Sequence, residues 1–179
     1  MPNYDWHHCV SLLSGAYNKP FMSNQFFVFL STVSYHPGQK TGFMDCMQAS
    51  GLELREEWII HIDRLIYENG IAVAERLLAL EDRPTGLVSS NDISVSILNE
   101  LISHGVRVPE DISICNCEDS QMAMHCQISL TSMRVDFARM AADAVKTLCR
   151  RRRQPSMPRS QLIYNPILIE RSSVRNLNA

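Results

Sequence analysis

The chain has 179 residues, of which 45% are hydrophobic and 20% are charged, a composition typical of a globular domain with enough apolar side chains for one core. The formal net charge of −2 excludes a general electrostatic attraction to nucleic acid. No segment approaches the roughly 18 consecutive apolar residues that a membrane-spanning helix requires.

Neither a secretory signal nor a disulfide framework is indicated. The first residues, Met1 to His8, contain no basic region followed by an apolar one, so we expect the chain to stay in the cytoplasm. The six cysteines include no Cys-x-x-Cys pair, which in a chain of this size favours reduced and mostly buried thiols.

The amino-terminal part of the chain alternates between helical and extended patterns. Residues 5–19 have the apolar spacing of an amphipathic helix that ends before Pro20. Phe26 to Leu30 is a continuous apolar run of strand length, and the polar residues 31–41 predict a loop after its carboxyl end. A helix is predicted from Gly42 to Gly51. In doubly wound sheets, loops that follow strands hold ligands.

A second strand and helix follow. Trp58 to Ile62 is the strand candidate, and Asn69 can cap the helix after it. The apolar residues of this helix fall on one face. They are Ile71, Ala74, Leu77, Leu78 and Leu80.

The next segment predicts a strand–helix–strand unit. Gly86 to Ser89 is a short run suited to a buried strand, and a helix is expected to begin near Asn91. Gly105 stands where the C-cap of that helix belongs. Ile112 to Cys117 predicts a second buried strand, so the two strands should lie parallel in one sheet.

The carboxyl-terminal part predicts one more helix and an extended end. Residues 136–149 carry an apolar stripe, and Arg150 to Arg153 follow where cations complement the helix dipole, although such a run could also contact phosphates. Apolar residues at 162–164 and 167–169 predict the last extended segment. The elements together predict the α/β class, with a Rossmann-like parallel sheet flanked by helices.

Four motifs follow one another in a set order. They are Arg83-Pro84-Thr85, Asn91-Asp92, Gly105 to Ser113, and Leu130 to Arg134. In order and spacing they resemble the C-terminal part of the effector-binding domain of LacI/GalR-type transcriptional regulators, and Glu170 to Ser173 resembles that family's terminal motif. The resemblance covers most of the chain and implies the C-terminal subdomain of a periplasmic-binding-protein-like type I fold.

The resemblance also implies a division of the chain into parts of two subdomains. Residues 1–134 and 160–175 would form the C-terminal subdomain, whereas the helix at 135–150 would belong to an N-terminal subdomain that is otherwise absent. No helix-turn-helix DNA-binding domain is expected in the chain. Because each large apolar side chain contributes roughly 1.5–3 kcal/mol when fully buried, we expect this helix to leave an exposed apolar patch that rearrangement, self-association or a partner would relieve.

The resemblance places four residues on one half of a sugar-binding cleft, namely Gln39, Asn91, Glu118 and Phe137. Sugar recognition needs planar polar groups and an aromatic face, because a hydroxyl that is buried unpaired costs about 1–3 kcal/mol. Asn91 matches the family, and it could also serve as a helix N-cap. Gln39 stands where the family usually has arginine, and Glu118 where it usually has aspartate. Phe137 matches an aromatic that reaches the cleft in some members, and it could instead belong to the core.

No combination of residues indicates catalysis or a metal site. His7-His8-Cys9 and His125-Cys126 lack the set of four ligands that zinc takes. Cys115 and Cys117 would share one face of a buried strand, which disfavours redox chemistry. No nucleophile is paired with a base and no glycine-rich phosphate loop exists, so we expect neither an enzyme nor a cofactor.

We therefore expect the effector-binding and oligomerisation portion of a LacI-type repressor that responds to a sugar or another small metabolite. It would form a homodimer or higher oligomer, contact no membrane, and meet operator DNA only through the absent DNA-binding headpiece. Two alternatives stay open. One is a transport-type sugar-binding protein, which would need an export signal and both lobes, and the other is a truncated remnant that mainly self-associates.

Overall fold

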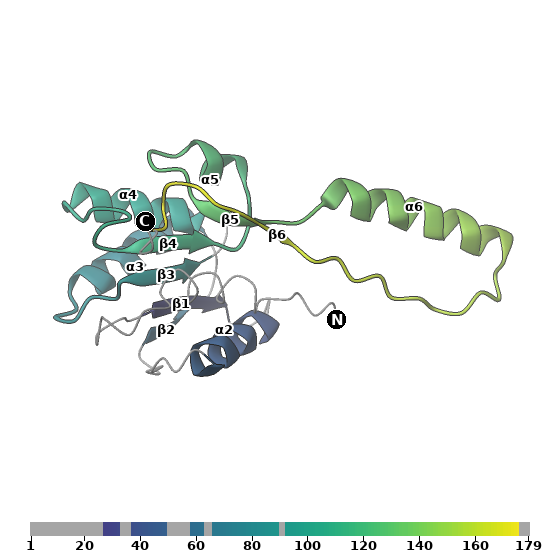
Figure 1. The fold of residues 1–179 in the computed structure, drawn as a ribbon, viewed down its shortest axis with the longest axis horizontal. Helices are drawn as coiled ribbons and strands as arrows, with labels where there is room; N and C mark the ends of the chain where they lie inside the picture. The colour runs from purple at the N-terminus through teal and green to yellow at the C-terminus, as the bar shows by residue number, and fades with distance from the viewer. Residues whose placement is uncertain (1–26, 33–36, 50–57, 63–65, 90–91, 176–179) are drawn as a thin grey trace.

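The computed structural model describes residues 27–32, 37–49, 58–62, 66–89 and 92–175. Within these residues, six strands form one sheet in the order β2-β1-β3-β4-β5-β6 (Figure 1). The strands are β1 (Phe27–Thr32), β2 (Ile59–Ile62), β3 (Gly86–Ser89), β4 (Ser113–Asn116), β5 (Thr131–Arg134) and β6 (Ile167–Ile169). The helices are α2 (Pro37–Ala49), α3 (Tyr67–Leu78), α4 (Ile93–Ser103), α5 (Gln121–His125) and α6 (Phe137–Arg153).

The sheet is parallel from β2 through β5, which confirms the predicted α/β class. The strand order reverses at β1, because the chain passes from β1 to β2 on one side and then to β3 on the other. In doubly wound sheets, ligands bind beyond the carboxyl ends of the strands at such a switch point. Strand β6 pairs antiparallel with β5, a reversal that the sequence pattern did not predict.

Apolar side chains cover both faces of the sheet. Leu87 and Ile114 belong to one buried cluster with side chains of α3 and α4. Their strand neighbours Val88 and Cys115 are equally buried but lie outside that cluster. Successive residues of a strand point to opposite faces. Both β3 and β4 are therefore interior strands, as their continuous apolar runs predicted.

Two predicted helix starts were wrong. Helix α2 begins at Pro37, so residues 37–41, which the sequence predicted as loop, form its first turns. Proline suits the first helical position, because its fixed φ is helical and its missing N–H has no partner there. Helix α3 begins at Tyr67 with Ile66 as its N-cap residue, so the predicted cap Asn69 lies inside the first turn.

The carboxyl end of α4 was predicted correctly. Gly105 adopts a φ of 78° and follows the C-cap residue His104. Its N–H donates to the carbonyl of Ile102 at 2.9 Å, and the N–H of Val106 donates to the carbonyl of Leu101 at 3.0 Å. These two bonds form a Schellman motif, in which glycine takes the left-handed position because it has no Cβ.

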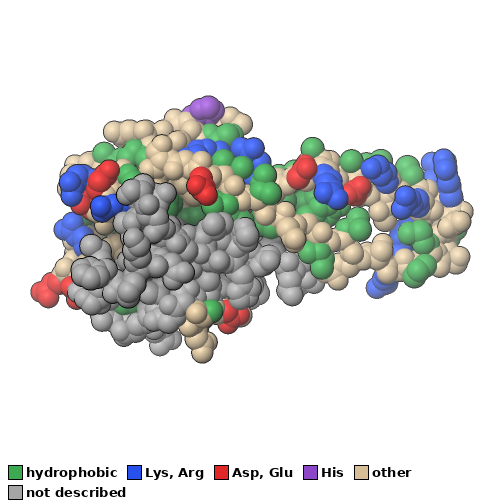
Figure 2. Space-filling model, in the orientation of Figure 1, with side chains coloured by type: hydrophobic (Ala, Val, Ile, Leu, Met, Phe, Trp, Pro, Cys, Tyr) green, Lys and Arg blue, Asp and Glu red, His purple; other side chains and the backbone are tan. Residues whose placement is uncertain are grey.

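Helix α6 and residues 154–166 form an arm that stands away from the sheet (Figure 1). The helix ends at Arg153, four residues beyond the prediction, and none of its residues is buried. Phe137, Val145 and Leu148 are 69%, 62% and 70% exposed, which confirms an exposed apolar face on this helix. Figure 2 shows Lys and Arg side chains gathered toward the tip of the arm.

The returning half of the arm is attached to α6 by polar contacts. The hydroxyl of Tyr164 donates to Asp143 Oδ2 at 3.0 Å, and the guanidinium of Arg139 lies 6.0 Å from the centre of the Tyr164 ring. Arg151 donates to the carbonyl of Pro158 at 3.0 Å. Residues 162–164, predicted as extended, lie outside the strands of the described residues, and β6 begins at Ile167. None of the described helices is long and apolar enough to cross a membrane.

Helices α3 and α4 pack closely at Gly70. A Cβ added at Gly70 would lie 2.6 Å from Ser96 Cβ and 2.9 Å from the carbonyl oxygen of Ile93. Because overpacking of this kind forces backbone shifts, Gly70→Ala should lower the free energy of unfolding in urea by about 1–3 kcal/mol. Adding Ser96→Gly should restore part of that loss. A Gly70→Ala chain at least as stable as the parent would mean that helix propensity outweighs the contact.

Candidate functional site

The carboxyl edge of the sheet brings together the segments that carry three of the four predicted site residues. Gln39 lies in the first turn of α2, after β1, and Glu118 follows the end of β4 by two residues. Asn91 lies outside the described residues, in the connection between β3 and α4. Strands β1, β3 and β4 are neighbours in the sheet, and Ser89 at the end of β3 pairs with Asn116 at the end of β4. The three segments therefore start from one edge.

A buried polar network holds this edge. Ser94 Oγ donates to Asn116 Oδ1 at 2.9 Å, so the hydrogen bond between the hydroxyls of Ser89 and Ser94 takes its proton from Ser89. The amide of Asn116 donates in turn to the backbone carbonyl of Glu118. All three network side chains are buried. Since buried polar groups must be paired, the network fixes the backbone that follows β4.

The loops after β3 and β4 are also joined directly. Ser120 Oγ donates to Asp92 Oδ1 at 3.2 Å, and Asp92 is the N-cap residue of α4, one residue after the predicted Asn91. Ser120 itself caps α5, because its Oγ accepts from the N–H of Ala123 at 3.2 Å. Between these fixed points, the side chain of Glu118 is exposed to solvent. A carboxylate is thereby presented at the edge where ligands bind in such sheets.

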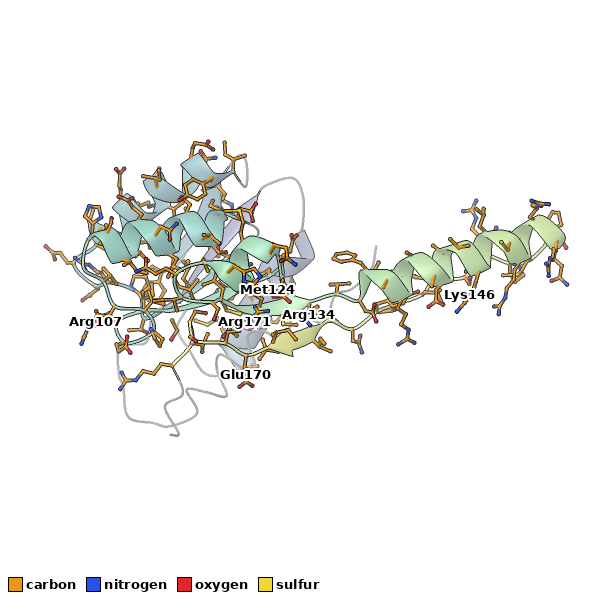
Figure 3. The ribbon with its side chains drawn as sticks, turned by 90° about the horizontal axis from the view of Figure 1, so that it is seen from above. Arg107, Met124, Arg134, Lys146, Glu170 and Arg171 are labelled. Carbon is orange, nitrogen blue, oxygen red and sulfur yellow. The ribbon has the colours of Figure 1, made fainter. Side chains whose placement is uncertain are left out.

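Asp119 forms two ion pairs that link the edge to the last two strands. Its Oδ2 lies 2.6 Å from Arg134 Nε, and its Oδ1 lies 2.6 Å from Arg171 Nη2. Arg171 also donates to the carbonyl of Leu130 at 2.6 Å. Arg134 and Arg171 belong to the motifs Leu130–Arg134 and Glu170–Ser173, but nothing in the sequence indicated that they meet Asp119. Figure 3 shows Arg134 and Arg171 close together beside β5 and β6.

Phe137 is not a core residue. It is the first residue of α6, and its side chain is 69% exposed. Its backbone follows Asp136, whose Oδ1 accepts from the N–H of Arg139 at 2.9 Å and so caps the helix. Phe137 lies at the base of the arm, and its place in a ligand site stays a prediction.

Among the described residues, no group of three His, Cys, Asp or Glu side chains could hold a metal ion. The thiol of Cys126 donates to the carbonyls of Ala123 and Ile128, at 3.3 and 3.1 Å. Residues 7–9, the other metal candidate, lie outside the described residues.

A doubly wound sheet with polar groups gathered at its carboxyl edge is the architecture of one lobe of a ligand-binding domain. The chain belongs to the periplasmic binding protein-like domain family, whose model matches residues 25–174. Within that family it is similar to the effector-binding domain of LacI-type transcriptional regulators, as the motifs indicated.

Two curated relatives and two solved structures illustrate the similarity. The chain is 30% identical over 138 residues to the HTH-type transcriptional repressor PurR of Photobacterium profundum, a match that covers 76% of this chain and 41% of the repressor. It is 27% identical over 139 residues to the ribose operon repressor of Haemophilus influenzae, with the same two coverages. The chain thus spans about 41% of the length of these relatives.

Solved structures share the fold. A LacI regulator from Lactobacillus casei with bound Tris superimposes with a TM-score of 0.78 at 22% identity, covering 97% of this chain and 62% of the regulator. A sugar-binding LacI-family regulator from Escherichia coli, in complex with phosphate, gives a TM-score of 0.81 at 21% identity, covering 97% and 61%.

The thiol of Cys115 supplies a pH-dependent test of this part of the fold. Burial raises the pKa of Cys115 to about 12, from an ordinary value of 9.0. Between these values the unfolded chain loses the proton and the folded chain keeps it, so the contribution of Cys115 to stability is complete below pH 9 and falls as the pH rises. The melting temperature should therefore drop less above pH 9 in a Cys115→Ala variant than in the parent.

Labelling provides the control for that measurement. At pH 8, iodoacetamide should modify the exposed Cys149 of the folded chain, whereas Cys115 and Cys117 should react only after unfolding, because the thiolate is the reactive form. Peptide mapping by mass spectrometry distinguishes the sites. Equal labelling of Cys115 and Cys149 in the folded chain would contradict the buried position of β4.

Proposed function

We propose that the chain is the effector-binding and self-associating portion of a LacI-type transcriptional repressor, acting in the cytoplasm, with a sugar or related small metabolite as effector. The observation that carries this proposal is the exposed carboxylate of Glu118 on a backbone fixed by Asn116, at the carboxyl edge of a doubly wound sheet. The ribose operon repressor among the relatives supports a sugar. So do the structures of the Lactobacillus casei regulator with bound glucose and with bound sucrose.

The four proposed ligand residues offer different chemical groups to a sugar. The Glu118 carboxylate can accept hydrogen bonds from two neighbouring hydroxyls, and the amides of Asn91 and Gln39 can each donate and accept. The ring of Phe137 offers an apolar face for the C–H surface of a sugar. Hydroxyl recognition by such groups is selective, because a polar group left unpaired in a closed site is costly.

We propose further that the apolar face of α6 packs against a second lobe, the N-terminal subdomain of a complete regulator. The support is the exposure of Phe137, Val145 and Leu148, three large side chains on a helix with no buried residue. With a ligand between two lobes, one arrangement of the lobes would be favoured, and operator affinity would change through the DNA-binding part of the regulator.

Calorimetric titration tests the ligand proposal. The probes are D-ribose, D-glucose and sucrose, added to the chain as it exists. Glu118→Ala should weaken binding of the recognised sugar roughly tenfold or more, because hydrogen bonds to a charged group contribute about 1.5–3 kcal/mol. Glu81→Ala is the matched control, since Glu81 is exposed and lies between α3 and β3, away from the carboxyl edge. Equal losses in both variants, or no binding of any probe at millimolar concentration, would contradict a sugar effector at Glu118.

Sedimentation velocity at several concentrations tests self-association. In the absence of a second lobe, the apolar face of α6 should make the chain associate as its concentration rises. Leu148→Lys should shift the distribution toward monomer, because it places a charge on that face. Ala142→Lys, at an exposed position of the same helix outside the stripe of Phe137, Val145 and Leu148, should have a much smaller effect. A chain that stays monomeric at the highest concentration would rule out α6 as an associating surface.

A further inference from the structure

Asp119 joins three parts of the molecule that are distant in sequence. It lies in the segment after β4, and its two ion pairs of 2.6 Å reach Arg134 at the end of β5 and Arg171 just after β6. The side chain of Asp119 is 3% exposed, against 46% for Arg134 and 14% for Arg171. Asp119 Oδ2 accepts a charge-assisted hydrogen bond from Arg134 Nε, whereas Oδ1 has only the nearby charge of Arg171. Loss of either arginine would leave a carboxylate that is shielded from water with less compensation.

The two strands that Asp119 holds are the roots of the arm. Strand β5 leads into α6 through Val135 and Asp136, and β6 is where the arm returns to the sheet (Figures 1 and 3). Arg134 pairs with Ile167 in the antiparallel register, so the Asp119–Arg134 ion pair sits where the arm leaves the sheet. Arg171 follows β6 at the end of that strand opposite the arm, so its ion pair anchors β6 itself.

On its other side, Asp119 is adjacent to the proposed ligand residue. Asn116 holds the carbonyl of Glu118, and the arginines hold the side chain of Asp119. The short segment between these fixed points therefore has little freedom. A change in the backbone of Glu118 must either move the Asp119 carboxylate relative to the two arginines or break an ion pair.

We propose that Asp119 is a positioning residue that couples the ligand-binding segment after β4 to the two strands that carry the arm. The assignment of a ligand to that segment rests on the proposed function, whereas the coupling itself is a property of the chain alone. A ligand bound at Glu118 changes the stability of the arm roots through Asp119, and thereby the presentation of α6 to whatever covers it.

Hydrogen exchange of the ligand-free chain tests the coupling. In Asp119→Asn, amides of β6 and of residues 117–120 should exchange about tenfold faster than in the parent, whereas the core amides of α3 and α4 should change little, because the ion pairs stabilise one local unit. Asp111→Asn is the matched control. Asp111 also pairs with an arginine, Arg107, but on the surface between α4 and β4, and its loss should leave β6 unchanged.

The double variant separates a local coupling from a general loss of stability. Arg134→Gln should accelerate β6 exchange in the parent and have little further effect in Asp119→Asn, since both changes break the same ion pair. Equal acceleration of every amide in Asp119→Asn, additive effects in the double variant, or an unchanged β6 would each overturn the proposal.

A second measurement distinguishes this proposal from the proposed function. If D-ribose, D-glucose or sucrose binds, it should slow β6 exchange in the parent, and in Asp119→Asn it should still bind but no longer protect β6. Binding with undiminished protection in the variant would overturn the coupling. If none of the sugars binds while the ligand-free results hold, the sugar effector fails and the coupling stands.

Discussion

Ser173 completes the sheet where β4 and β5 do not pair with each other. Its hydroxyl donates to the carbonyl of Ile114 at 2.6 Å and accepts from the N–H of Thr131 at 2.8 Å, and its carbonyl accepts from the N–H of Ile114 at 2.8 Å. The side chain is fully buried. Direct pairing of β4 with β5 is confined to two residue pairs, beginning with Cys115 and Thr131. Without Ser173, buried backbone groups in the middle of the sheet would lose their partners, at a cost of about 1–3 kcal/mol each.

The geometry of the site follows from this constraint. Ser173 fixes the position of β5 against β4, and β5 ends in Arg134. Two residues before Ser173, Arg171 donates from its backbone to Thr131 Oγ1 at 3.0 Å and from its guanidinium to Leu130. The two arginines that meet Asp119 are thus held by the same insertion of the carboxyl-terminal segment. A serine that is not among the proposed ligand residues thereby helps to hold both arginines that meet Asp119.

The elements with strong local signals were predicted well. Strand β3 has the predicted bounds, and β2 begins one residue later than predicted. Gly105 follows the end of α4, as expected. These features were predictable because apolar runs and glycine caps depend on residues that are neighbours in the sequence. The start of α2 was wrong, since Pro37 and the polar residues after it are compatible with both a loop and a first helical turn. The expected position of the candidate residues, at the carboxyl edge of the sheet, could be predicted from the topology alone.

The interactions around that edge could not be predicted. Ser94 and Asn116 are 22 residues apart in the sequence, and Asp119 and Arg134 are 15 residues apart. Neither helical nor strand periodicity predicts contacts over such separations. Motif positions placed Glu118 on the predicted sugar-binding cleft, but they did not reveal that the side chain of Asp119 beside it is almost fully shielded from solvent and paired with two arginines. Phe137 shows the opposite case. Its stripe suggested a core position, yet burial depends on a surface that the described part of the chain does not supply.

The separation of Ser173 from Ile114 along the sequence also constrains the order in which the chain folds. Its partner Ile114 was synthesised 59 residues earlier, and at ribosomal rates of about 5–20 residues/s that interval lasts roughly 3–12 s. During that time β4 and β5 have emerged without the residue that joins them, and the whole arm lies between. Closure of this loop is a long-range event with a large entropic cost. The pairing of β4 with β5 is therefore completed only after Ser173 has been synthesised, and until then the two strands are open to wrong pairing in the nascent chain.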